Sequence, residues 1–154
     1  MLTAADVMTT EVFSVPPEAP IHDVAKLMYT KRIGGVPVID AAKRVIGMIS
    51  KGDLIRHAQV VGERRRPWWV ATFTSTSALA HDYIKTHARI ARDVMTQGAI
   101  TVSATATLAE IAKVLEQHRI KRVPVVEDGE VIGMVTRVDL LQALAAVDAA
   151  SAAS

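Results

Sequence analysis

The chain has 154 residues, half of them hydrophobic, so it is long enough to bury a core and too apolar to be disordered. It lacks cysteine, which excludes disulfides and thiolate metal sites, and its net charge of +2 is too small to indicate a nucleic-acid-binding protein. No signal-peptide pattern opens it and no apolar run approaches roughly 18 residues, so we expect a soluble, cytoplasmic protein without a membrane span.

The first part of the chain alternates between strand-like and helix-like patterns. Apolar residues recur at helical spacing from Ile21, and Gly34 and Gly35 end that pattern. Two wholly apolar runs joined by a polar turn then predict a buried hairpin. The sequence predicts strands at 12–15, 36–39 and 45–49 and helices at 21–32 and about 50–61.

The second part repeats this order. It predicts strands at 100–102, 123–126 and 131–135 and helices at 108–119 and 136–147. The shared unit is therefore β-α-β-β-α, a mixed α/β (α+β) fold. Because the helices of each unit cover one face of a three-stranded sheet, we expect the two units to pack sheet to sheet on their apolar faces.

The repeat is also visible residue by residue. The stretch RIGGVPVIDAAKRVIGMISKGDLI at 32–55 returns as RIKRVPVVEDGEVIGMVTRVDLL at 119–141. A match of this length in apolar and polar positions alike indicates two homologous units with function at their junction. We divide the chain into repeat 1 at 1–60, a connector at 61–92, repeat 2 at 93–148 and an Ala/Ser-rich tail at 149–154.

Each repeat ends its hairpin with a hydroxyl residue three positions before an aspartate, Ser50 with Asp53 and Thr136 with Asp139. The structural interpretation is a capping box, in which the side chains satisfy backbone N–H groups at a helix start. The functional interpretation adds a ligand, because a carboxylate there can accept hydrogen bonds from a vicinal diol while the hydroxyl and free N–H groups face a phosphate. The second copy favours the ligand.

Lys121 and Arg122 stand just before the second Val-Pro-Val strand, where repeat 1 has Gly34 and Gly35. They suit a solvated helix end, where cations are favourable, or the anionic end of a nucleotide pocket. The glycines predict unequal phosphate binding by the two repeats.

The connector carries RRRPWW at 64–69, which could contact phosphate, nucleic acid or a membrane surface, or could pack its tryptophans on the module or a dimer mate. Three arginines are too few for strong nucleic-acid binding. Catalytic patterns are weak: there is no Walker A or Gly-x-Gly-x-x-Gly sequence, and the histidines lack metal-ligand spacing. We therefore expect no enzyme and no required cofactor.

Together the doubled Val-Pro-Val, Val-Ile-Gly-Met and [Ser/Thr]-x-x-Asp elements make the chain resemble a pair of cystathionine β-synthase (CBS) domains, over residues 1 to about 58 and 90–147. The resemblance implies a pseudo-twofold module with two clefts that bind adenosine-containing ligands. It implies that Asp53 and Asp139 hold ribose hydroxyls, that Ser50 and Thr136 lie near phosphate and that Lys121 and Arg122 reach the phosphates. The segments that would enclose the base are Ser14, Val15, Val36, Pro37, Val38, Thr101, Val102, Val123, Pro124 and Val125.

We thus expect a non-catalytic sensor that binds an adenine nucleotide or S-adenosylmethionine, pairs as a homodimer and regulates an unidentified protein target. The alternative is an interaction module that acts through dimerisation and the Arg/Trp connector, with vestigial clefts.

Overall fold

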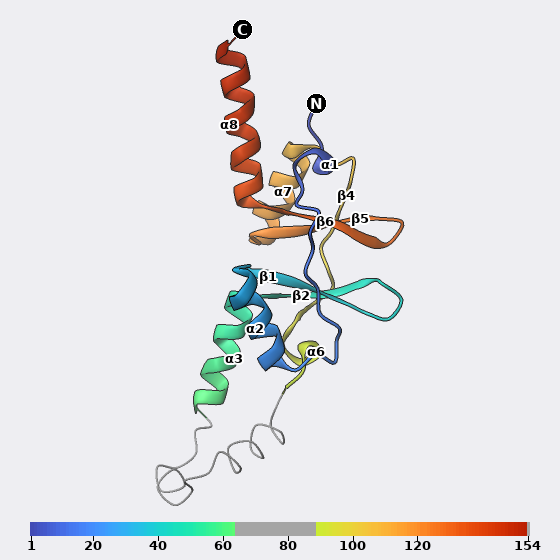
Figure 1. Ribbon diagram of the computed structural model, residues 1–154, viewed down its shortest axis with the longest axis vertical. Coiled ribbons are helices and arrows are strands. Elements are labelled where there is room, and N and C mark those ends of the chain that lie inside the picture. Colours follow the sequence, from blue (N-terminus) through green and yellow to red (C-terminus); the bar gives the residue numbers. More distant parts are fainter. Residues whose placement is uncertain (64–88, 154) are drawn as a thin grey trace, which may run out of the picture.

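The computed structural model describes residues 1–63 and 89–153. Most of the predicted connector, including 64–69, lies outside these residues. Figure 1 shows two halves whose sheets lie in the middle of the molecule and whose helices cover the outer sides. None of the helices in the described ranges is both long and apolar enough to cross a membrane.

The first half contains α2 (Ile21–Lys31), a hairpin of β1 (Gly35–Ile39) and β2 (Val45–Ser50), and α3 (Lys51–Glu63). The second half contains α7 (Leu108–His118), a hairpin of β5 (Arg122–Glu127) and β6 (Glu130–Thr136), and α8 (Arg137–Ala153). Both hairpins are antiparallel, and both shift register once, after Val38 and after Val125. The predicted helices and hairpins, and the sheet-to-sheet arrangement of two pseudo-twofold halves, are confirmed.

The helices α2 and α7 end in the same way. Their C-caps, Arg32 and Arg119, adopt the left-handed conformation with φ of 55° and 52°. This sharp turn carries the chain from the outer helix into the central strand. Arginine occupies a position where glycine is favoured, so the turn places an arginine side chain at the same point of each half.

The leading strands are shorter than predicted. Of the predicted strand 12–15 only Val15 pairs, in a parallel bridge with Val38. The predicted strand 100–102 becomes β4 (Val102–Ser103), which runs parallel to β5. The prediction for 12–15 was wrong in extent because these apolar residues run as a connecting segment between the halves, where Figure 1 shows the chain passing from one sheet to the other.

Each half also receives the segment that leads into the other repeat. The short helix α1 (Ala4–Val7) docks on the second half, where the Ala4 N–H donates to the Ala106 carbonyl at 2.8 Å. Correspondingly α6 (Ala91–Val94) docks on the first half, where the Ala91 N–H donates to the Ala19 carbonyl at 2.8 Å. Ala4 and Ala91 are fully buried, each in the core of the other repeat.

The segments before each repeat also pair with the sheet of the other repeat. The strand β3 (Thr96–Gln97) completes the first sheet, with Thr96 opposite Met48, and Thr9 forms an antiparallel bridge with Met134 in the second sheet. The preceding methionines, Met95 and Met8, pack over the glycines of those hairpins, Gly47 and Gly133. The repeated Met-Thr and Val-Ile-Gly-Met motifs therefore fit each other across the two repeats.

Candidate functional site

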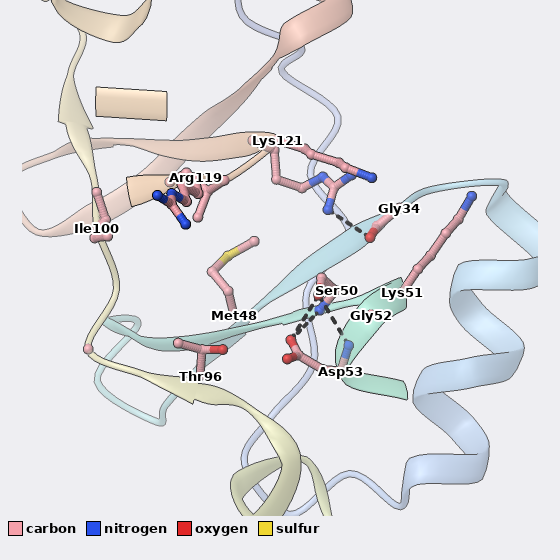
Figure 2. A pocket seen from close by; sticks show the side chains of 13 residues that line it. Gly34, Met48, Ser50, Lys51, Gly52, Asp53, Thr96, Ile100, Arg119 and Lys121 are labelled. Carbon is pink, nitrogen blue, oxygen red and sulfur yellow. Dashed lines mark hydrogen bonds between the residues drawn. The ribbon is translucent and has the colours of Figure 1, made fainter. Parts of the chain in front are cut away.

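A cavity of about 480 Å³ lies between the two halves. One side comes from the end of the first hairpin and the start of α3, and the other from the turn between α7 and β5 (Figure 2). The segment around β3 links the two sides. The lining residues are Gly34, Met48, Ser50, Lys51, Gly52, Asp53, Thr96, Gly98, Ile100, Arg119, Ile120, Lys121 and Arg122.

Asp53 lies in the first turn of α3, and its side chain is only 9% exposed. Its Oδ2 accepts from the Ser50 backbone N–H at 2.8 Å and from the Ser50 hydroxyl at 3.0 Å, and the Asp53 N–H donates back to the Ser50 Oγ at 3.3 Å. The capping box therefore exists, and Figure 2 shows both side chains at the cavity wall. The structural and functional interpretations of this motif are compatible, because the cap holds the carboxylate at the cavity.

The other oxygen of this carboxylate, Oδ1, pairs with the guanidinium of Arg56, one helical turn further along α3. The Arg56 side chain is 69% exposed, so the pair joins a buried acid to a surface arginine. In this structure both oxygens of Asp53 therefore have partners within their own half.

Cations dominate the lining. Arg119 and Lys121 enter from the side opposite Asp53 in Figure 2, and Lys51 and Arg122 complete the set. The left-handed turn at Arg119 and the start of β5 bring these groups to the cavity. Asp53 is the one acidic residue among the described residues that line it. The site therefore has the composition expected of a pocket for an anion.

Arg122 connects the two halves. Its Nη1 donates to the Gly34 carbonyl at 2.7 Å, and the same carbonyl accepts from the Lys51 N–H at 3.0 Å. A Cβ at Gly34 would lie 2.4 Å from Nη2 of Arg122, and one at Gly35 would lie 2.5 Å from Nη1. Partial burial lowers the pKa of the Arg122 guanidinium through desolvation. The two glycines of repeat 1 thus leave the space that the arginine of repeat 2 fills.

The second copy of the motif has the same local geometry but does not line this cavity. The Thr136 N–H donates to Oδ2 of Asp139 at 2.8 Å, and the Asp139 N–H donates to Oγ1 of Thr136 at 3.2 Å. Asp139 is half-buried. Its predicted role at a ligand therefore stays a prediction.

The cavity brings together four residues of the predicted site: Ser50, Asp53, Lys121 and Arg122. The residues predicted to enclose a base lie outside its lining: Val15, Val36, Pro37, Val38, Val102, Val123, Pro124 and Val125 are buried, Thr101 is half-buried beside Ile100, and Ser14 is exposed. Their contact with a ligand remains a prediction.

Sequence reasoning missed several lining residues, among them Met48, Ile100 and Arg119. Their positions depend on how the two halves face each other, which local patterns do not report. One signal was available: Arg119 and Arg32 occupy the same position of the repeat, each four residues before the first valine of a Val-Pro-Val strand. Within residues 1–63 and 89–153 no three His, Cys, Asp or Glu side chains gather as a metal site.

Comparisons with known proteins agree with this architecture. The CBS domain model matches residues 4–59 and 91–146. The chain is 28% identical over 149 residues to the chloroplastic CBS domain-containing protein CBSX1 of Arabidopsis thaliana, covering 92% of this chain and 63% of that protein. It thus spans less than two thirds of this plant relative. It is 32% identical over 133 residues to the uncharacterized protein MJ1426 of Methanocaldococcus jannaschii, with 79% of each chain covered.

Among solved structures, that of Arabidopsis CBSX2 in complex with AMP superposes with a TM-score of 0.74 at 26% identity, over 96% of this chain and 99% of that chain. The family matches cover both halves of the fold, including the exchanged segments around Ala4 and Ala91. The chain therefore belongs to the CBS domain family, and it carries two tandem copies of the domain.

Proposed function

We propose that this CBS pair is a non-catalytic regulatory module that binds an adenosine-containing ligand in the cavity beside Asp53. The observation that carries the proposal is the composition of that cavity, where a capped carboxylate from one repeat faces a group of cations from the other. The AMP bound by the related CBSX2 supports the ligand class.

The ribose is the part of such a ligand that Asp53 would hold. A carboxylate offers about four acceptor positions, and the structure uses two on Oδ2 and one on Oδ1. A vicinal diol would use the remaining position on Oδ1 and compete with Arg56 or with the Ser50 hydroxyl for another. Ligand binding is thus expected to rearrange the polar contacts at the start of α3.

The apolar and cationic parts of the lining suit the two ends of the ligand. Met48, Ile100 and Ile120 supply apolar surface against which a base can pack. Lys121 and Arg122 supply charge-assisted donors to phosphate oxygens, with Arg122 able to donate in pairs. A cavity of about 480 Å³ lies within the ordinary range of small-ligand sites, roughly 300–1,000 Å³.

Regulation follows from the position of the cavity between the repeats. A ligand that touches both halves has a different affinity for each relative arrangement of the halves, so it shifts the population toward the arrangement it fits. A protein target that senses this arrangement would then respond to the ligand. We further propose that this protein acts in the cytoplasm, whereas the plant relative CBSX1 is named chloroplastic.

A thermal-shift panel with AMP, ADP, ATP, S-adenosylmethionine and NAD tests the proposal. A ligand at 100 times its Kd stabilises by about 2.7 kcal/mol, which for a chain of this size shifts Tm by roughly 5–10 °C. We expect such a shift with at least one ligand and its loss in Asp53→Ala. Asp23→Ala removes an exposed carboxylate of α2 that does not line this cavity and is the control. No shift with any ligand at millimolar concentration would refute the proposal.

A second candidate function is assembly, which an exposed apolar face of α8 favours. Val138, Leu141 and Leu144 are 60%, 65% and 55% exposed, and they recur every three residues on one side of the helix. Ile55, which occupies the position of Leu141 in the other repeat, is 62% exposed on α3. We propose that these residues contact a second copy of the chain in a homodimer.

A further inference from the structure

The charges in the cavity are strongly unbalanced. Lys51, Arg119, Lys121 and Arg122 contribute four cations, and Asp53 contributes one carboxylate. That carboxylate already pairs with Arg56. Its negative charge is therefore offset from within its own helix, and the four cations of the lining are left without an acid of their own among the described lining residues.

Repeat 2 lacks this arrangement, which provides an internal comparison. The residue three positions after Asp139 is Gln142, which carries no charge, whereas Arg56 stands three positions after Asp53. The residue before each aspartate differs too. A Cβ at Gly52 would lie 3.4 Å from Nη1 of Arg56, so the guanidinium lies over this glycine, whereas repeat 2 has Val138 there, 60% exposed. The paired glycine and arginine belong to one repeat alone.

The pairing changes which ligand the cavity favours. A free Asp53 would repel a phosphate and attract a cationic ligand, in addition to accepting from ribose hydroxyls. With Arg56 on Oδ1, the repulsion is reduced and one acceptor position for the ribose is taken. The pair between Asp53 and Arg56 thus strengthens binding of the phosphates of a ligand and weakens binding of its ribose.

We propose that the Asp53 cavity selects its ligand by negative charge, taking a nucleotide whose phosphates carry two or more charges in preference to an uncharged nucleoside or a sulfonium compound, and that Arg56 is a specificity-determining residue for this choice. This inference rests on the proposed adenosine-ligand function and narrows it. Arg56 acts by neutralising Asp53, while Lys121, Arg122, Arg119 and Lys51 contact the phosphates.

Isothermal titration with adenosine, AMP, ADP and S-adenosylmethionine tests the charge selection. Because charge-assisted hydrogen bonds are about twice as strong as neutral ones, we expect ADP to bind at least about tenfold more tightly than adenosine, with AMP between them. S-adenosylmethionine should bind no better than adenosine. Raising the salt concentration from about 50 to about 300 mM should narrow the ratio of ADP to adenosine affinity, since screening weakens attraction between exposed charges.

The variant Arg56→Gln, which introduces the residue found at position 142, tests the role of Arg56. Freeing the Asp53 charge should weaken ADP binding and leave adenosine binding equal or tighter, so that the affinity ratio falls about threefold or more. A merely structural role would weaken both ligands together. The control Arg92→Gln removes an arginine that pairs with Glu18 away from the cavity, and should leave the ratio unchanged.

The outcomes separate the two proposals. Adenosine binding as tightly as ADP, or S-adenosylmethionine binding most tightly, would overturn charge selection while the adenosine-ligand function stands. An unchanged ratio in Arg56→Gln would overturn the role of Arg56. Failure of all four ligands to bind the wild-type chain would overturn the proposed function and this inference with it.

Discussion

The guanidinium of Arg122 donates to the backbone carbonyl of Gly34, 88 positions earlier in the chain, at 2.7 Å. The same carbonyl accepts the Lys51 N–H at the start of α3. The Arg122 side chain of repeat 2 and the first N–H of α3, the helix that positions Asp53, therefore share one acceptor, the Gly34 carbonyl. Any ligand group that draws Arg122 away from Gly34 also changes the contacts of that helix.

Gly34→Ala should destabilise the fold by about 1 kcal/mol, because the new methyl group would occupy the position of the guanidinium and break a charge-assisted hydrogen bond that is partly exposed. Urea denaturation measures the change. In an Arg122→Ala background the same substitution should cost clearly less, since the contact has already been lost. Equal costs in both backgrounds would contradict this explanation.

Gly47→Ala and Gly133→Ala form a matched pair with different expected costs. A Cβ at Gly47 would lie 2.5 Å from Sδ of Met95 and 2.7 Å from the backbone carbonyl oxygen of Thr96, which is held in the sheet. At Gly133 the three nearest atoms belong to the side chain of Met8. We expect Gly47→Ala to cost about 2–3 kcal/mol and Gly133→Ala about 1 kcal/mol by denaturant unfolding. A larger loss of stability in Gly133→Ala than in Gly47→Ala would show that the backbone at Thr96 adjusts to the new methyl group more easily than the Met8 side chain does.

Stability should fall slightly on acidification through the titration of His57. Desolvation, with a smaller effect of the Arg89 charge, lowers the pKa of this half-buried histidine. The unfolded chain therefore takes up the proton first, and stability present above the ordinary histidine pKa of about 6.5 is lost as the pH falls below it. The unfolding free energy at pH 7.5 and pH 5.5 should differ less in His57→Gln than in the wild type.

The variant His118→Gln controls for removing one histidine from the chain. A pH dependence that is the same in His57→Gln and in the wild type would assign the acid sensitivity to other groups.

The apolar face of α8 predicts a concentration-dependent assembly. If Leu141 and Leu144 contact a second copy, Leu141→Glu with Leu144→Glu should halve the molar mass seen by light scattering, because charge at a desolvated interface is strongly unfavourable. Tyr29→Glu replaces another exposed apolar residue, 87% exposed on α2, and should leave the mass unchanged. A wild-type chain that is monomeric at high concentration would refute the homodimer.

The elements of the fold could be predicted because their signals are local. The helical spacing from Ile21 and the two apolar runs around Pro37 and Pro124 contain the information that forms α2 and both hairpins. The segment 12–15 shows the limit of this reasoning. Its apolar residues resemble a strand, but pairing requires a neighbour in register, and only Val15 has one.

Individual residues of the candidate site could be predicted from the sequence, but which residues come together in one cavity could not. The repeated motif indicated Ser50 and Asp53, and the basic pair indicated Lys121 and Arg122, yet nothing in the sequence shows that these four share one cavity. That depends on the relative position of the halves. The pair between Asp53 and Arg56 was not predicted, because an arginine three residues after an aspartate is common on helix surfaces and the sequence does not show that Asp53 is buried.

The exchanged segments bear on how a single repeat would behave alone. The Met8 side chain packs over Gly133, and the Met95 side chain packs over Gly47. A lone repeat would therefore lack the methionine that covers its hairpin glycine, and its own N-terminal methionine would lack a glycine to pack against. Two identical copies could satisfy both needs only by trading these segments with each other. A single repeat expressed alone is thus expected to associate with a second copy that supplies the missing segment, and the chain as it stands holds both partners in one molecule, with Gly35 in one repeat where the other has Arg122.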